Sequence, residues 1–459
     1  MAALHLPSLG RYPSFPHGVH PPEEKHLTKE LPIRRFPFAP FLVLMLAQHA
    51  GRPAKPVVRE GQEVARGQIV AEADGFVSAP IHAPASGVVK KVGHALDVNG
   101  RMAPAIVLEP YPGSTQQVAW GQPVDPAALS PAELIGAIQR MGMVGLGGAA
   151  FPAHVKFTPP KGRIINTLII NGAECEPYLT ADHRVMLEYP GDVLSGTEII
   201  RRALNAPRAV IAVESNKLDA ADVLRRALAE RAGRNGGPGA DTLRVAVLET
   251  KYPQGAEKML TQALLGREIP SGGLPADVGV MVSNVTTAAE IGMLMPRGWG
   301  LIERVITITG RGVKKPGNYL MPIGTPLNFI LEQVGLESAA REVIFGGPMM
   351  GKAVAFLETA ITKGVSGILV MTDGELPPAR PVFPCIRCGE CLNACPMHLN
   401  PSQLGLLARR NLFEEMATGF HLFDCFECGC CSYVCPANLP LVQTFRLAKE
   451  FVRERRAAK

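Results

Sequence analysis

Cys385-Ile-Arg-Cys388-Gly-Glu-Cys391-Leu-Asn-Ala-Cys395-Pro396 is the stretch that decides the fold of the last part of this chain, and its spacing recurs as Cys425-Phe-Glu-Cys428-Gly-Cys-Cys431-Ser-Tyr-Val-Cys435-Pro436. Nine of the ten cysteines lie in these two runs. Both runs have the pattern C-x2-C-x2-C-x3-C-P, in which three thiolates of one run hold one iron–sulfur cubane and the fourth reaches the neighbouring cubane. The sequence therefore predicts two [4Fe–4S] clusters.

The crossed fourth ligand decides which cysteines share a cluster. We assign one cluster to Cys385, Cys388, Cys391 and Cys435, and the other to Cys395, Cys425, Cys428 and Cys431. Zinc is the alternative for four thiolates, but zinc sites usually pair two C-x2-C knuckles and lack this run of three cysteines. Cys430 falls outside the repeat, and we interpret it as a free thiol near a cluster.

The segment between the two runs has helical character. Asn400 and Pro401 are typical of a helix N-terminus, and Leu404 and Leu407 continue with helical spacing. A helical insertion of this length resembles the α-helical ferredoxin arrangement. We therefore expect residues 376–459 to form a helical domain that carries the clusters and transfers electrons.

Length, charge and hydropathy narrow the class of protein. A chain of 459 residues is long enough for several domains, and its net charge of +6 suits an acidic electron carrier or an anionic membrane surface. The sequence has no basic patch interleaved with aromatic residues, so it does not indicate a nucleic-acid partner. The first residues show no signal-peptide pattern. The most apolar stretch, residues 36–50, contains Pro37 and Pro40 and is too short for a spanning helix, so we interpret it as a buried strand in a cytoplasmic protein.

Residues 1–33 are interpreted as an N-terminal extension, and residues 34–120 form the first expected domain. Short apolar pairs alternate there with glycines, which predicts a small β barrel or sandwich. The pattern of residues 60–68 resembles the lipoyl and biotinyl carrier fold. Because no lysine stands at the hairpin tip, where that family attaches its cofactor, we expect a structural module.

Residues 121–300 alternate strand-like and helical runs, which predicts an α/β domain with a largely parallel sheet. The expected strands are residues 164–170, 209–213 and 243–248, and the expected helices are residues 131–141, 191–204, 219–232 and 256–265. Residues 301–375 begin with a strand at 305–309 and pass through the turn-rich stretch 310–324 into a helix at 326–334. This region resembles the ligand-binding β-grasp module.

A glycine-rich loop lies in the expected α/β domain. It reads Met141-Gly-Met-Val-Gly145-Leu-Gly147-Gly148-Ala-Ala-Phe151-Pro-Ala-His-Val-Lys156-Phe157. Clustered glycines let backbone N–H groups approach a phosphate or a flat ring, and Lys156 adds positive charge. Taken alone, the loop is equally compatible with a structural turn.

This loop resembles the flavin-binding loop of the NADH-oxidising subunit of respiratory complex I. Three later stretches resemble the same family in the same order: Asn171-Gly-Ala-Glu174-Cys175-Glu176-Pro177, Tyr252-Pro-Gln-Gly255-Ala-Glu257 and Val282-Ser-Asn284-Val285-Thr-Thr287. Ala173 and Ala256 stand where that family usually has Asp and Glu. The resemblance implies an oxidoreductase with FMN and a nicotinamide site.

The whole chain, including residues 18–22 and 346–351, resembles the C subunit of the Rnf (also called Rsx) electron transport complex. The resemblance implies a peripheral subunit on the cytoplasmic face of the bacterial inner membrane. It would exchange electrons between NAD(H), FMN and two [4Fe–4S] clusters in an ion-translocating ferredoxin:NAD+ oxidoreductase. The implied partners are the other subunits, ferredoxin or another small acidic carrier, and NAD(H), with no nucleic acid.

Site residues follow from the matching positions. The implied FMN residues are Gly145, Gly147, Gly148, Lys156, Asn171, Glu174, Asn284 and Thr287. The implied nicotinamide residues, an aromatic face for stacking and carboxylates for ribose hydroxyls, are Phe151, Glu176, Tyr252 and Glu257.

Two alternative functions stay open. One is a non-catalytic iron–sulfur wiring and docking subunit without a functional flavin site, which Ala173 and Ala256 favour. The other is the flavin subunit of a soluble hydrogenase or formate dehydrogenase, which shares the flavin loop but not the paired C-terminal cysteine runs.

Overall fold

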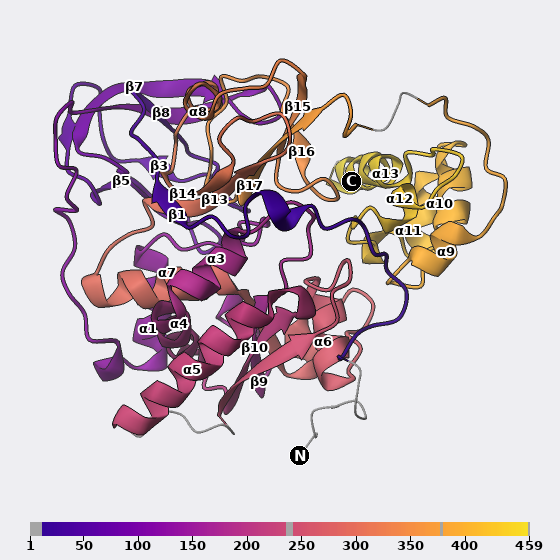
Figure 1. Ribbon diagram of the computed structural model, residues 1–459, viewed down its shortest axis with the longest axis horizontal. Helices are drawn as coiled ribbons and strands as arrows, with labels where there is room; N and C mark the ends of the chain where they lie inside the picture. Colours follow the sequence, from indigo (N-terminus) through magenta and orange to yellow (C-terminus); the bar gives the residue numbers. More distant parts are fainter. Residues whose placement is uncertain (1–11, 236–241, 377–379, 458–459) are drawn as a thin grey trace.

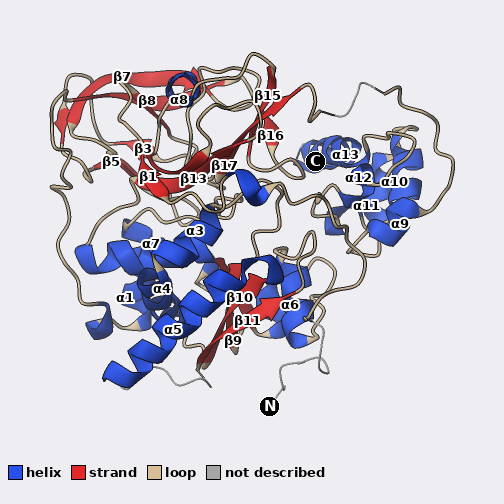
Figure 2. Ribbon diagram, viewed as in Figure 1, coloured by secondary structure: helices blue, strands red, loops and turns tan. Residues whose placement is uncertain are grey.

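The computed structural model describes residues 12–235, 242–376 and 380–457. Three regions built on β-sheets lie together, and a helical C-terminal domain stands beside them (Figure 1 and Figure 2). The N-terminal segment passes between that helical domain and the rest of the molecule (Figure 1). This arrangement brings residues from both ends of the chain close to one another.

The first region is a small sandwich of short strands. One sheet has the strand order β2-β8-β7-β4 and the other has the order β3-β5-β6. Leu44, Val70, Val89 and Ile106 are buried in its core. The strands are β2 (Leu42–Met45), β3 (Lys55–Pro56), β4 (Glu63–Val64), β5 (Ile69–Glu72), β6 (Ile81–His82), β7 (Gly87–Leu96) and β8 (Met102–Pro110). The strand β2 confirms the buried strand that we predicted within residues 36–50.

The α/β region contains a parallel four-stranded sheet of order β11-β10-β9-β12. Its strands are β9 (Thr167–Gly172), β10 (Arg208–Glu214), β11 (Leu243–Leu248) and β12 (Val280–Asn284). The order runs outward from β9 to β11 and then restarts with β12 on the other side of β9. The carboxyl ends of β9 and β12 therefore form a topological switch point, the place where open α/β sheets bind ligands.

Helices cover both faces of this sheet. They are α1 (Pro131–Arg140), α2 (Ala153–Lys156), α3 (Ala181–Glu188), α4 (Pro190–Ala203), α5 (Leu218–Asn235), α6 (Glu257–Leu265) and α7 (Val285–Leu294). Helix α6 packs on one face through Leu260 and Leu264, whereas α1, α4 and α7 share the core of the other face. The predicted strands and helices are confirmed to within a few residues, while α3, α7 and β12 were not individually predicted.

The third region is a six-stranded sheet of order β1-β14-β13-β17-β15-β16 with helix α8 (Leu327–Val334). Its strands are β1 (Ile33–Arg35), β13 (Glu303–Thr309), β14 (Gly317–Pro322), β15 (Ala340–Phe345), β16 (Lys352–Ala353) and β17 (Gly367–Thr372). The strand β14 lies in the stretch that we interpreted as turn-rich, because Gly317 and Pro322 mark only its ends. The edge strand β1 comes from the end of the N-terminal extension and pairs in parallel with β14.

The C-terminal domain is helical, as expected. Its helices are α9 (Glu390–Ala394), α10 (Pro401–Ala408), α11 (Phe413–Gly419), α12 (Cys430–Tyr433) and α13 (Leu441–Ala457), packed around Leu404, Met416 and Phe445. The side chain of Asn400 accepts the Gln403 N–H at 3.0 Å, which confirms the predicted start of α10. Among the described residues, none of these helices or any other combines the length and apolarity that crossing a bilayer requires.

Candidate functional site

The two cysteine runs fold in the same way. Each passes through a left-handed residue and a left-handed glycine at matching positions, Arg387 and Gly389 in the first run and Glu427 and Gly429 in the second. Each then enters a short helix, α9 or α12. The repeated spacing in the sequence therefore corresponds to a repeated backbone conformation.

Each run contributes cysteines to two separate hollows. One hollow is lined by Cys385, Cys388, Cys391 and Cys435. The lining of the other includes Cys395, Cys425, Cys428 and Cys431. We call them the outer and the inner hollow. These are the two sets that the crossed-ligand pattern predicts.

The hollows fit a polynuclear cluster better than a single ion. In the described part of the chain, no group of three or more His, Cys, Asp or Glu side chains is arranged to hold one metal ion. Zinc would require four sulfurs at about 2.3 Å from a common centre. Four predicted cysteine ligands around one hollow instead match the donor set of an iron–sulfur cubane.

The two hollows differ in their exposure. Cys388 of the outer hollow is exposed, whereas Cys395, Cys428 and Cys431 of the inner hollow are buried. The outer hollow also has an apolar rim, in which Ile386 is 66% exposed. Cys430 is fully buried and lines the inner hollow beside the four predicted ligands.

The inner hollow faces the α/β region. The Tyr252 hydroxyl, from the loop after β11, donates a hydrogen bond of 2.7 Å to the carbonyl of Cys428. Tyr252, Cys428 and Cys430 share one buried apolar cluster, against which Cys175 and Met349 pack. The loop predicted to form the nicotinamide site is therefore in direct contact with a cluster-binding loop.

The glycine loop lies at the topological switch point. A Cβ atom on Gly147 would stand only 3.3 Å from the Asn284 side chain, at the carboxyl end of β12. The N–H of Leu146 donates to the Thr287 hydroxyl at 2.9 Å, and Asn284 caps the first turn of α7 by accepting the Thr287 N–H. Three predicted flavin residues, Gly147, Asn284 and Thr287, are thus assembled around one strand end.

The exposed face of this loop fits a phosphate or a flat ring. The N–H groups of Gly147, Gly148 and Ala149 donate to no other group in the described residues, and all three residues are exposed. Lys156 lies on the short helix that follows the loop and forms an ion pair with Glu257 at the start of α6. Exposed backbone N–H groups followed in sequence by a lysine are a donor set that suits a phosphate.

The predicted acidic residues have other partners as well. Glu174 is buried, and its two oxygens accept the N–H groups of Asp182 and His183 at the start of α3. Glu176 accepts the N–H groups of Met349 and Met350, and burial raises the pKa of its carboxyl to about 7. Both carboxylates therefore hold loops of the protein itself.

The other predicted residues lie around these loops. Asn171 donates to the Gly255 carbonyl at 2.8 Å and so joins two of the motifs. Phe151 is half-buried at the end of the glycine loop, where its carbonyl accepts the Gly145 N–H at 2.8 Å. Tyr252 is 1% exposed and offers no free ring face to a ligand.

Sequence reasoning missed three residues that shape the candidate flavin and nicotinamide sites. Arg304 of β13 is buried and donates to the carbonyl of Leu146 in the glycine loop at 3.0 Å. Asp182 accepts hydrogen bonds from Asn284 and Thr286. Lys25 donates to the carbonyls of Glu176 and Leu179. None belongs to a motif, and only the tertiary fold brings them to the site.

Family models match four parts of the chain. A Nuo51 FMN-binding domain matches residues 138–293, and a 4Fe-4S dicluster domain matches residues 382–439. An RnfC barrel sandwich hybrid domain matches residues 13–111, and an SLBB domain matches residues 305–353. The predicted fold class is thereby confirmed: a lipoyl-like sandwich, a flavoprotein-like α/β domain, a β-grasp module and a helical ferredoxin-like domain. The fold and its two kinds of site define a flavin and iron–sulfur electron-transfer protein.

Relatives of known name cover almost the whole chain. The C subunit of the proton-translocating ferredoxin:NAD+ oxidoreductase complex of Clostridium ljungdahlii is 44% identical over 89% of this chain and 87% of its own length. The Na+-translocating counterpart of Acetobacterium woodii is 39% identical over 88% and 89%, and the C subunit of the ion-translocating oxidoreductase complex of Rhodobacter capsulatus is 40% identical over 96% and 84%. This chain belongs to that family of C subunits, which confirms the resemblance seen in its sequence.

A solved structure shares the fold. The NAD+-reducing [NiFe]-hydrogenase in its H2-reduced state superposes with a TM-score of 0.50 at 19% identity, over 70% of this chain and 64% of that chain. At this identity the likeness concerns the fold alone.

Proposed function

We propose that this chain is the NAD(H)-linked electron-exchange subunit of a membrane-bound, ion-translocating ferredoxin:NAD+ oxidoreductase complex. Its relatives are C subunits of such complexes, and its own FMN-binding and 4Fe-4S dicluster domains supply the two kinds of cofactor site. The observation that carries the proposal is the contact between the Tyr252 loop and Cys428. It joins the region of the flavin site to a cluster-binding loop within one chain.

The flavin is proposed to bind at the switch point between β9 and β12. Bound FMN supplies the chemistry that converts a two-electron hydride donor into single electrons. The chain contributes the N–H groups of Gly147 and Gly148, the cation of Lys156 and the amide of Asn284, with Gly145, Asn171, Glu174 and Thr287 shaping the surrounding loops.

The nicotinamide is proposed to approach beside Phe151 and Glu257. Glu257 lies at the start of α6 and is half-buried. Its carboxylate can therefore accept a hydrogen bond from a ribose hydroxyl in addition to its ion pair with Lys156. Glu176 and Tyr252 belong to the matching stretches 171–177 and 252–257. Glu176 holds the Met349 loop and the Tyr252 hydroxyl holds the Cys428 loop, and these two loops enclose this side of the site.

The exposure of the hollows suggests an order for the clusters. The inner hollow, lined by Cys395, Cys425, Cys428 and Cys431, contacts the flavin side, so its cluster is proposed to exchange electrons with the flavin. The outer hollow has an exposed ligand, Cys388, and an apolar rim, and exposed apolar patches often mark interaction sites. Its cluster is proposed to pass electrons to the other subunits of the complex or to ferredoxin.

The proposal also covers the position of the chain in the cell and its division into domains. The family implies a peripheral subunit on the cytoplasmic face of the inner membrane. We propose the domain bounds predicted from the sequence: the sandwich at residues 34–120, the flavin domain at 121–300, the β-grasp module at 301–375 and the cluster domain at 376–459. The N-terminal extension is residues 1–33.

The test is a cofactor and reduction assay on the anaerobically purified chain. The proposal expects acid-released FMN, two clusters by iron and sulfide content, and bleaching of the clusters by NADH. A wiring subunit without a flavin site would contain iron and sulfide, but it would release no flavin and would stay coloured with NADH. That result would replace the proposed function by the non-catalytic alternative.

A further inference from the structure

Residues 13–31 of the N-terminal extension cross the molecule as a strap. Its first half follows the loop after β11: the N–H of Glu249 donates to the Pro13 carbonyl at 3.0 Å, and Lys251 donates to the Phe15 carbonyl at 2.9 Å. Val19 and Tyr252 then exchange two backbone hydrogen bonds of 2.9 and 3.0 Å. The strap thus holds the residue whose hydroxyl reaches Cys428.

The same few residues of the strap contact the cluster domain. Gly18 donates its N–H to the carbonyl of Ala394 at 3.2 Å, and His17 Nδ1 lies 2.7 Å from the carbonyl of Asn393. The rings of His17 and His398 meet edge to face at 4.5 Å. Asn393 and Ala394 directly precede Cys395, a ligand from the first run in the inner hollow. Figure 1 shows this indigo segment beside the yellow cluster domain.

Position 18 has no space for a side chain beside Tyr252. Its φ angle is +80°, and a Cβ atom there would stand 2.6 Å from the Tyr252 carbonyl oxygen. Real Cβ atoms essentially never come that close, so a side chain would push the strap away from Tyr252 or toward Ala394. Glycine is required here by both the backbone angle and the contact.

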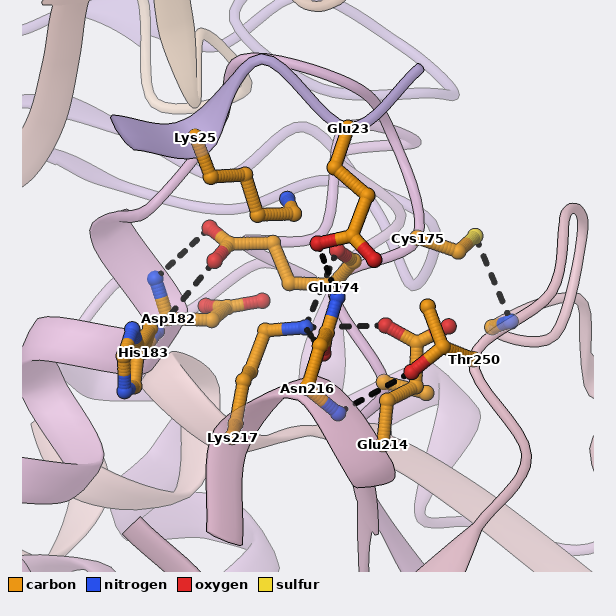
Figure 3. A network of polar contacts seen from close by, with 12 residues as sticks. Glu23, Lys25, Glu174, Cys175, Asp182, His183, Glu214, Asn216, Lys217 and Thr250 are labelled. Atoms are coloured by element: carbon orange, nitrogen blue, oxygen red, sulfur yellow. Dashed lines mark hydrogen bonds and ion pairs between the residues drawn. The ribbon is translucent and has the colours of Figure 1, made fainter. Parts of the chain in front are cut away.

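The second half of the strap is anchored at the flavin side. Lys25 is buried and donates to the carbonyls of Glu176 and Leu179, and the Thr28 hydroxyl contacts the Thr180 hydroxyl at 2.7 Å. Figure 3 shows Lys25 and Glu23 reaching down over Glu174 from the strap. Moving a buried lysine away from its partners costs free energy, so Lys25 fixes the strap at this end.

We propose that the strap is a positioning element for electron transfer, in which His17 and Gly18 hold the inner cluster at its working distance from the flavin. This inference rests on the proposed function. NADH loses two electrons and one proton in the step concerned, each cluster gains one electron, and the proton goes to water. The strap takes no part in that chemistry. It ties Cys395 and Cys428, from two different runs, to the Tyr252 loop, and the rate of electron transfer falls steeply as two redox centres separate.

The first test compares four strap variants by anaerobic rapid mixing with NADH. His17→Ala and Gly18→Ala should slow cluster bleaching by about tenfold or more, since small displacements of reacting groups cost factors of this size. Reduction of a dye by NADH, which needs only the flavin, should stay unchanged. His17→Asn should recover most of the rate, because Asn keeps an N–H donor and tolerates the φ angle of 65° at this position. His20→Ala, at an exposed strap residue, is the matched control.

The second test measures position without using NADH. Hydrogen exchange should increase at Tyr252 and at residues 393–395 in Gly18→Ala but not in His20→Ala, at unchanged iron content. If both the exchange and the bleaching rate are unchanged in His17→Ala and Gly18→Ala, the strap does not position the cluster. If dye reduction slows as much as bleaching, the strap acts on the flavin site instead. A wild-type chain that NADH fails to bleach would overturn the proposed function, and the exchange result would still decide the role of the strap.

Discussion

The hydroxyl of Tyr252 donates a 2.7 Å hydrogen bond to the carbonyl of Cys428, a residue 176 positions later in the chain. Both residues are buried, and both belong to motifs that were recognised for different reasons. The bond shows that the motif predicted for the nicotinamide site also supports Cys428, a proposed cluster ligand. A single hydroxyl therefore links the two halves of the proposed electron path.

Removing that hydroxyl should weaken the inner cluster. Tyr252→Phe leaves the Cys428 carbonyl without its donor in a buried place, which costs about 1–3 kcal/mol. We expect faster loss of visible cluster absorbance in the presence of an iron chelator, at normal initial iron content. Tyr433→Phe is the control, because Tyr433 lies in the same domain and is largely exposed. Equal rates of loss in the two variants would contradict a supporting role for Tyr252.

The crossed ligand sets predict which cysteine variants resemble one another. Cys388→Ala and Cys435→Ala come from different runs but line the same outer hollow. Each should lose the same one of two EPR signals and about half of the iron, since each cubane needs its four thiolates. Cys430→Ala should keep both signals. Loss of different signals in Cys388→Ala and Cys435→Ala would show that the fourth ligands are not exchanged.

Lys156 should contribute to flavin affinity through the phosphate. Charge-assisted hydrogen bonds contribute about 1.5–3 kcal/mol, so Lys156→Met should weaken FMN binding by roughly one to two orders of magnitude. Riboflavin, which lacks the phosphate, should bind almost as well as to the wild type. Titration of the flavin-free chain with each compound measures both effects. Lys161→Met, at an exposed lysine nearby in the sequence, provides the control.

Individual helices and strands could be predicted because the sequence features that determine them lie within or next to each element. The run Leu243-Arg-Val-Ala-Val-Leu248 forms a strand with the predicted bounds, since β-branched residues favour that conformation wherever it is placed. The spacing of the cysteines likewise corresponds to a local backbone conformation that both runs share. Asn400 and Pro401 start α10 for reasons contained within one helical turn.

The contacts that join the domains could not be predicted in this way. Nothing near Arg304 indicates that its guanidinium will reach the carbonyl of Leu146, 158 residues earlier. The same holds for Gly18 and Ala394, and for Ile33, which pairs with Asn318 in β14. Glu174 and Glu176 were predicted from a family pattern, which indicates a location but not which N–H groups each carboxylate accepts.

Glu290 should make stability depend on pH. It is buried in α7, and burial, with the nearby charge of Glu303, raises the pKa of its carboxyl to about 8. Between pH about 4.5 and about 8, the unfolded chain has lost a proton that the folded chain retains, so the free energy of unfolding falls as pH rises. Glu290→Gln should melt like the wild type near pH 4.5 and at a higher temperature at pH 8. Glu332→Gln, at an exposed position, should show no such growing difference.

The buried charges beneath the strap should be strongly coupled to one another. Lys25 and Lys217 lie with Glu174 and Glu214 in one group, in which Lys217 pairs with Glu214 at 2.8 Å (Figure 3). Burial lowers the pKa of Lys25 and raises the pKa of Glu174. Each group therefore depends on the opposite charge beside it.

Lys25→Met should cost about 3–5 kcal/mol, because breaking a buried ion network leaves a carboxylate uncompensated. Lys29→Met should cost little, because the Lys29 side chain is about half exposed and pairs with the exposed Glu30. The decisive comparison is the double variant Lys25→Met with Glu174→Gln. Removing both charges should recover part of the loss, since Gln still offers an oxygen to the first N–H groups of α3, and the coupling energy follows from denaturant unfolding of all four proteins. If the two single losses simply add, Lys25 does not compensate Glu174, and its role reduces to the hydrogen bonds that it donates to Glu176 and Leu179.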